Sequence, residues 1–216
     1  MKLGVLGTGT VGRTIATALV AKGYDVKLGS RAADHAGARE WVERSGSHAS
    51  QGTFADAAAH GAITFNCTNG MHSIAALRTC RDALHGKVLI DVTNALDGSK
   101  GFPPSLFVCN TDSLAEQIQR ELPETRVVKA LNTLTASLMV DGTRIPDTDV
   151  FVAGNDAEAK ASVAGLLHKA FGWPREHVID AGDITASRGL EMFVPLWLRL
   201  YGALGTGIFN IRVVKG

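Results

Sequence analysis

A glycine-rich turn near the N-terminus constrains the fold of this chain more than any other feature. Residues 7–12 have the sequence Gly-Thr-Gly-Thr-Val-Gly, between the mostly apolar run 2–6 and the helical pattern 11–22. In such a strand–turn–helix setting, the first glycine allows the tight turn, the second lets a pyrophosphate approach the backbone, and the third lets the helix pack close to the strand. We therefore expect the turn to bind a dinucleotide at the helix N-terminus, where free N–H groups favour negative charge.

Short strand-like runs alternate with helical patterns along the rest of the chain. This alternation predicts an α/β protein with a Rossmann-like, doubly wound parallel sheet and a small C-terminal helical extension. We expect residues 1–150 to form the nucleotide-binding domain and residues 151–216 a smaller C-terminal part. The predicted strands are 2–6, 25–29, 62–67, 87–92, 126–130, 149–153 and 177–181.

Composition argues against several classes of partner. The chain has 22 Lys and Arg residues against 21 Asp and Glu, a net charge of +1 with no basic cluster, so we expect no nucleic-acid or anionic-membrane partner. No stretch reaches the roughly 18 apolar residues of a membrane span. Cys67, Cys80 and Cys109 are odd in number and form no C-x-x-C pair, which favours a reduced, cytoplasmic, metal-free protein.

The end of the second predicted strand indicates which dinucleotide is bound. NAD-binding proteins usually place Asp or Glu there, on the ribose 2′-hydroxyl. This chain has Leu28-Gly29-Ser30-Arg31 instead, so a 2′-phosphate would meet a hydroxyl donor and a guanidinium rather than a carboxylate. The sequence therefore favours NADP(H) over NAD(H). His35, slightly further on, is either part of this phosphate site or a plain surface histidine.

The segment 188–201 predicts a helix that is apolar almost all round. Only Arg188, Glu191 and Arg199 interrupt its apolar surface, and they share one sector of about 80°. Such a helix is expected to be buried on several sides. It would form a homodimer interface, the wall of an apolar acceptor pocket, or a central core helix, and Pro195 predicts a kink or a break within it.

Four segments together resemble a known family. They are the turn 7–12, Gly29-Ser30-Arg31, the run 91–94 (Asp-Val-Thr-Asn) and the run 127–133 (Val-Val-Lys-Ala-Leu-Asn-Thr). In these segments the chain resembles the NADPH-dependent oxidoreductases of the deazaflavin (coenzyme F420) reductase family. It is also similar to the reductase domain of the metalloreductase membrane proteins. The resemblance implies hydride transfer between nicotinamide C4 of NADPH, bound across the strand carboxyl ends, and C5 of the deazaflavin.

The resemblance also implies three groups of cofactor-binding residues. Those expected at the pyrophosphate are Thr8, Gly9, Thr10 and Val11, within the turn that Gly7 and Gly12 shape. Those expected at the 2′-phosphate are Ser30 and Arg31, with His35 where the family often carries a lysine. Those expected along the path from the adenine ribose to the nicotinamide are Thr68, Asn69, Asn94, Ala130 and Asn132. For Asn94 and Asn132 the alternative is a turn asparagine that bonds its own backbone.

No catalytic residue can be assigned from the sequence. There is no Ser/His/Asp arrangement, no H-E-x-x-H and no Tyr-x-x-x-Lys, but hydride transfer between stacked rings mainly needs positioning. His72 is the protonatable side chain best placed to stabilise negative charge on a reduced acceptor. Its alternative is a role as a helix cap or a plain surface residue. The sequence favours a hydride-transferring oxidoreductase that uses NADPH and a deazaflavin or flavin acceptor. The alternatives are an NADPH-dependent reductase of a small carbonyl or imine and a non-enzymatic NADP(H)-sensing protein.

Overall fold

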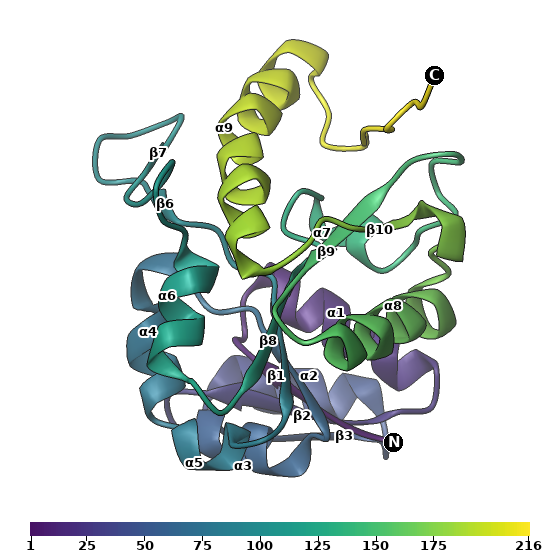
Figure 1. Cartoon of the computed structure of the whole chain (residues 1–216). Helices are drawn as coiled ribbons and strands as arrows, with labels where there is room; N and C mark the ends of the chain where they lie inside the picture. Colours follow the sequence, from purple (N-terminus) through teal and green to yellow (C-terminus); the bar gives the residue numbers. More distant parts are fainter.

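An eight-stranded sheet forms the centre of the computed structural model, which describes residues 1–216 (Figure 1). The strand order is β10-β9-β8-β5-β4-β1-β2-β3, and β6 and β7 form a separate two-stranded hairpin. The strands of the large sheet are β1 (Lys2–Leu6), β2 (Asp25–Ser30), β3 (Ala49–Thr53), β4 (Ile63–Asn66), β5 (Val88–Asp91), β8 (Arg126–Ala130), β9 (Val150–Ala153) and β10 (Val178–Asp180). The hairpin strands are β6 (Leu96–Asp97) and β7 (Ser105–Leu106).

The direction of the strands confirms the predicted fold class, with one difference at an edge. All pairs from β3 to β8 are parallel, which gives the doubly wound Rossmann-like arrangement. β9 instead pairs antiparallel with β8, and β10 pairs parallel with β9. Between β8 and β9 the chain forms only a four-residue helix, not the long crossover helix that a parallel pair needs. The sheet is therefore mostly parallel.

Helices cover both faces of the sheet. Neighbouring strand residues point to opposite faces, so that Ile90 joins one core and Leu89 the other. α1, α2, α7 and α8 pack over the first core, and α3 to α6 over the second. The helices are α1 (Thr10–Ala21), α2 (Ala36–Ser45), α3 (Phe54–His60), α4 (Gly70–Arg78), α5 (Arg81–Leu84), α6 (Leu114–Glu121), α7 (Ala136–Met139), α8 (Ala157–Phe171) and α9 (Ser187–Leu204), with short 3-10 helices η1 (Arg175–His177) and η2 (Ile184–Ala186).

All seven predicted strands are present, with ends that differ by at most one residue. Three further strands were not predicted: β3 and the two strands of the hairpin. The β3 sequence Ala-Ser-Gln-Gly-Thr has no large apolar residue, and it joins the sheet edge through backbone pairing with β2. The sequence pattern could not reveal it, because strand prediction depends on apolar alternation.

The C-terminal helix α9 departs from expectation. It runs unbroken through Pro195, so the predicted break is wrong. α9 rises from the carboxyl edge of the sheet (Figure 1), and within one chain only Ser187, Glu191 and Val194 are buried. Leu196 is 54% exposed, so the predicted burial on several sides and the alternative of a central core helix are wrong for the single chain.

The reason for this orientation of α9 is a pair of ionic contacts on its polar sector. Arg188 pairs with Glu116 on α6 at 2.6 Å, and Glu191 pairs with Lys129 on β8 at 2.9 Å. Burying these charged groups against partners turns the apolar sector outward.

No helix in the structure has both the length and the apolar character needed to cross a membrane.

Candidate functional site

A cleft with a volume of ≈ 920 Å³ opens where β1, β2 and β4 end. It is the place where ligands bind in open α/β sheets, beyond the carboxyl ends of strands at the point where the strand order reverses. Three loops line it with residues that the sequence singled out. These residues are Gly7, Thr8 and Gly9 after β1, Ser30, Arg31 and His35 after β2, and Thr68 and Asn69 after β4.

The three glycines of the turn differ in what surrounds them: two are packed too tightly for a side chain, and one borders open space. Gly7 has φ +116°, and a Cβ there would lie 2.5 Å from the carbonyl oxygen of Cys67. A Cβ on Gly12 would lie 1.9 Å from the carbonyl oxygen of Gly7, so α1 can pack on the turn only with glycine at this position. A Cβ on Gly9 would meet nothing within 4 Å, because Gly9 borders the open cleft. A bound group could thus approach the backbone at Gly9.

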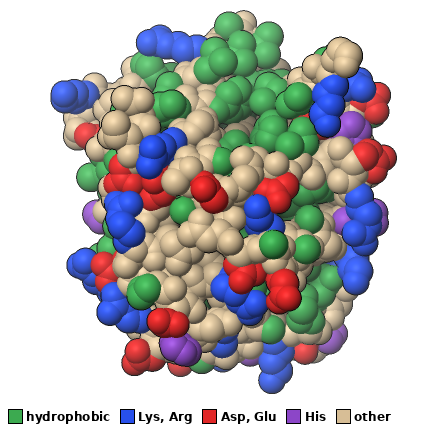
Figure 2. Space-filling view, viewed as in Figure 1, with side chains coloured by type: hydrophobic (Ala, Val, Ile, Leu, Met, Phe, Trp, Pro, Cys, Tyr) green, Lys and Arg blue, Asp and Glu red, His purple; other side chains and the backbone are tan.

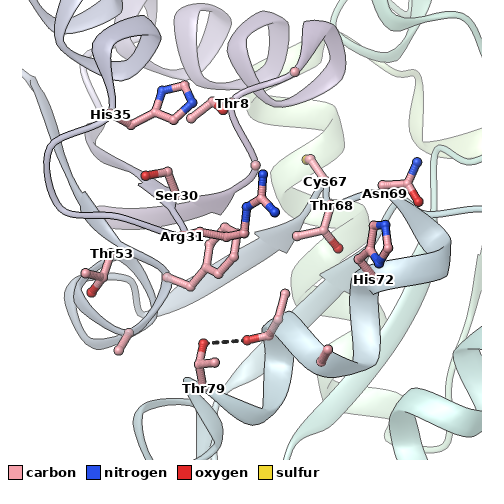
Figure 3. A pocket seen from close by; sticks show the side chains of 16 residues that line it. Thr8, Ser30, Arg31, His35, Thr53, Cys67, Thr68, Asn69, His72 and Thr79 are labelled. Carbon is pink, nitrogen blue, oxygen red and sulfur yellow. Dashed lines mark hydrogen bonds between the residues drawn. The ribbon is translucent and has the colours of Figure 1, made fainter.

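Arg31 extends into the cleft between His35 and Thr8 on one side and Thr68 and His72 on the other (Figure 3). No carboxylate lines the cleft. The Ser30 hydroxyl donates to the carbonyl of Ala32 at the end of β2. The Nδ1 atom of His35 accepts from the amide of Ala38, 3.3 Å away, and caps α2. A neutral His35 in this role carries its ring proton on Nε2.

Helix α4 supplies the opposite wall of the cleft. Asn69 is its N-cap, with Oδ1 accepting from the amide of Met71 at 3.0 Å. The Thr68 hydroxyl donates to Oδ1 of the buried Asn66 at 2.7 Å. The exposed His72 also lines this wall. The wall therefore combines polar side chains with free N–H groups at the start of a helix.

Six of the predicted residues do not line the cleft. Thr10, Val11 and Gly12 lie in the first turn of α1, and Ala130 is fully buried within β8. Asn94 and Asn132 form a reciprocal pair: Asn94 donates to the carbonyl of Asn132 at 2.9 Å, and Asn132 donates to Oδ1 of Asn94 at 2.9 Å. Neither Asn94 nor Asn132 has the self-bonded turn geometry offered as its alternative.

Sequence reasoning missed part of the cleft and a buried charged cluster. The missed cleft residues lie at the end of the unpredicted β3 and the start of α3, at Cys67 directly after β4, and along α4 and its C-cap. For the charged cluster a signal exists, since Lys129 lies inside an apolar strand and is the register partner of Asp91 on β5. His72, which the sequence singled out, also lines the cleft, and the residues that were missed are Thr53, Phe54, Ala55, Cys67, Ala75, Ala76 and Thr79.

The surroundings of Cys67, which lines the cleft, disfavour its thiolate form. Burial, and after it the charge of Asp91, raises the pKa of the Cys67 thiol far above its usual range. Cys67 therefore stays protonated and is a poor nucleophile. No group of three or more His, Cys, Asp or Glu side chains is arranged to hold a metal ion.

Comparison with known proteins now decides the family. Residues 2–95 match the family model described as NADP oxidoreductase, coenzyme F420-dependent. The F420-dependent NADP reductase of Methanocaldococcus jannaschii is 30% identical over 220 residues, which cover 96% of this chain and 97% of the relative. The chain belongs to the F420-dependent NADP reductase family. As a member of this family it is an NADP-dependent oxidoreductase.

Two further proteins are similar to this chain over most or all of its length. A solved structure of a candidate F420-dependent NADP reductase from Arthrobacter sp. FB24 is 49% identical, with a TM-score of 0.92 and 100% coverage of both chains. The metalloreductase STEAP3 of Rattus norvegicus is 28% identical over 96% of this chain, which spans 40% of that protein. The similarity to the Arthrobacter structure thus covers the whole chain, whereas STEAP3 is a longer protein that this chain matches in part.

Proposed function

We propose that this protein transfers a hydride between NADP(H) and a deazaflavin (coenzyme F420) or flavin-like acceptor. The observation that carries the proposal is the position of α9. Its first turns contact the loop that follows β8, since Asn132 Nδ2 donates to the carbonyl of Leu190 at 3.0 Å, and this loop is bonded to the loop after β5 through Asn94. Apolar side chains continue outward from there along α9, and Figure 2 shows such side chains gathered at the top of the molecule. A flat aromatic acceptor suits such a surface beside the nucleotide cleft.

The cleft residues fit NADP(H). The open space at Gly9 and the amides at the start of α1 suit a pyrophosphate, with Thr8, Thr10 and Val11 beside it. Ser30, Arg31 and the Nε2 atom of His35 are the proposed donors to the 2′-phosphate. In this proposal the nucleotide then passes Thr68 and Asn69 toward the loops of Asn94 and Asn132, the second of which follows Ala130 at the end of β8.

When bound, the dihydronicotinamide supplies the reducing equivalent: its C4–H bond breaks, the acceptor gains the hydride with two electrons, and a proton from solvent completes the reduced acceptor. The protein's own contribution is to hold two rings in contact and exclude water. In this proposal the Asn94–Asn132 pair fixes the two loops on which the nicotinamide end rests. The family names of the relatives support the deazaflavin as the first acceptor to test.

We expect NADPH to be oxidised when the purified protein is given coenzyme F420, FMN, FAD or a ferric chelate, with the deazaflavin or a flavin as the fastest acceptor. The absorbance of NADPH is followed with each acceptor in turn, and reactions without protein serve as controls. Tight NADPH binding without turnover of any acceptor would contradict the proposal. It would favour a sensing protein or a reductase of small carbonyl or imine substrates.

We also propose that the exposed side of α9 is covered by a second copy of the chain, with the acceptor pocket between subunits and residues 151–216 contributing its wall. An apolar surface of this kind is uncommon on monomers. We expect light scattering to give a mass of about twice 22.8 kDa. A mass of 22.8 kDa that does not change with concentration would contradict this. The exposed apolar residues concerned are Met192, Leu196, Tyr201, Leu204, Ile208, Val213 and Val214.

A further inference from the structure

A continuous line of polar side chains, here called the buried polar chain, runs from the cleft to α9. It consists of Thr68, Asn66, Asp91, Lys129 and Glu191, and the last four are at most 1% exposed. Thr68 donates to Asn66 at 2.7 Å, and Asn66 donates to Asp91 at 2.9 Å. Lys129 Nζ then lies 2.6 Å from Asp91 Oδ2 and 2.9 Å from Glu191 Oε1. Each member thus contacts the next.

The charges of the buried polar chain are balanced from two sides. Lys129 also donates to the carbonyl of Thr93 at 2.7 Å, so its ammonium group lies close to three oxygens. Burial lowers the pKa of Lys129, but Asp91 and Glu191 outweigh this and hold the pKa above its ordinary value. Glu191 accepts the amides of Leu114 and Ala115 at the start of α6, at 2.9 and 3.1 Å. These amides offset the second carboxylate.

A parallel link joins the same elements nearer the surface. Asn94 and Asn132 bond each other, and Asn132 also bonds the carbonyl of Leu190 on α9. The carbonyl oxygen of Asn94 packs so closely on Gly70 that a Cβ on Gly70 would lie 2.0 Å from it. Gly70 directly follows the cleft residue Asn69. These contacts therefore fix the positions of α9, the loops of Asn94 and Asn132, and the cleft wall relative to one another.

We propose that Glu191, acting through Lys129 and Asp91, is a positioning residue for the transfer step: it fixes α9 relative to the nucleotide cleft. This inference rests on the proposed function, in which α9 borders the acceptor. Because a misplacement of about 1 Å can cost roughly 100-fold in rate, a shift of α9 affects turnover more than nucleotide binding.

The neighbouring residue Arg188 provides the matched control. Arg188 also attaches α9 to α6, through its ion pair with Glu116 at 2.6 Å. Neither Arg188 nor Glu116 contacts a member of the buried polar chain other than through the backbone of α9 or α6. Arg188→Gln therefore removes one attachment of α9 to α6 and leaves the attachment through the buried polar chain intact, whereas Glu191→Gln removes the charge that Lys129 contacts.

The first experiment measures backbone hydrogen exchange in residues 187–204 with and without saturating NADP⁺. We expect NADP⁺ to slow exchange in the parent and in Arg188→Gln, and to have no such effect in Glu191→Gln. If Glu191→Gln has lost its cooperative melting transition, Thr68→Val replaces it, since this change cuts the chain at its half-exposed cleft end. No response of α9 in the parent, or an unchanged response in the chain variant, would overturn the proposal.

The second experiment compares kcat with NADPH affinity, using whichever acceptor the parent reduces. For Glu191→Gln we expect kcat to fall at least about tenfold with the Kd for NADPH within about twofold. Arg188→Gln should keep kcat within about twofold. Equal losses in both variants, or weaker NADPH binding at unchanged kcat, would show a merely structural role. A parent without turnover contradicts the proposed function instead, and the exchange experiment still decides the role of Glu191.

Discussion

Replacement of Arg31 by alanine is expected to weaken NADPH binding by about 10- to 100-fold while NADH binding stays nearly unchanged. Arg31 is the cationic side chain that follows β2 and extends into the cleft (Figure 3). A hydrogen bond to a charged group contributes roughly 1.5–3 kcal/mol, and about 1.4 kcal/mol corresponds to tenfold in affinity. Only NADPH carries the 2′-phosphate, so only its binding loses this contact. Titration calorimetry with both nucleotides measures the difference.

Arg39→Ala is the matched control for Arg31→Ala. It removes the same charge from the next helix, where Arg39 pairs with Asp34 outside the cleft. Its NADPH affinity should remain within about twofold of the parent, because exposed ion pairs contribute little. Equal affinity of the parent for NADPH and NADH would contradict a 2′-phosphate site at this position. Equal loss of both nucleotides in Arg31→Ala would place Arg31 at a part of the nucleotide that the two share.

The cleft could be predicted largely from local sequence because its residues directly follow strands. Once strand, glycine turn and helix are recognised, chain order alone puts Gly9 and Arg31 at the same carboxyl edge. The pairing of Asn94 with Asn132 was beyond such reasoning. These residues are 38 positions apart, and their contact depends on β5 and β8 being neighbours in the sheet.

The orientation of α9 shows a second limit of sequence patterns. Its apolar pattern predicted a helix correctly, but it led us to expect burial on several sides, whereas the sector with Arg188 and Glu191 faces the protein body. A carboxylate such as Glu191 normally faces water, and it is buried here because Lys129 and the start of α6 provide partners. Those partners come from other strands and helices, so no window of sequence around α9 contains the information.

Lys129→Met is expected to lower the free energy of unfolding by about 3–5 kcal/mol at pH 8, because it leaves two buried carboxylates without their cation. Urea unfolding followed by circular dichroism measures the loss. Lys160→Met is the control: it removes a lysine whose partner Asp180 is 55% exposed, and such pairs contribute about 1 kcal/mol or less. Lys129→Met/Glu191→Gln should recover part of the loss, since one unpaired charge is then absent. A loss below about 1 kcal/mol in Lys129→Met would show that Lys129, Asp91 and Glu191 are not held together as buried ions.

The loss in Lys129→Met should shrink as the pH falls from 8 to 5. In the parent, Lys129 has a raised pKa, so its stabilising charge is fully present at every pH below the unfolded lysine value of about 10.4 and does not vary in this range. In the variant, the folded protein relieves its unpaired carboxylates by binding a proton that the unfolded chain, with carboxyl pKa values near 4, does not bind. Because the folded state then holds more protons than the unfolded state, its stability falls as the pH rises. A loss that is equal at pH 5 and pH 8 would mean that water reaches these carboxylates once the lysine is gone.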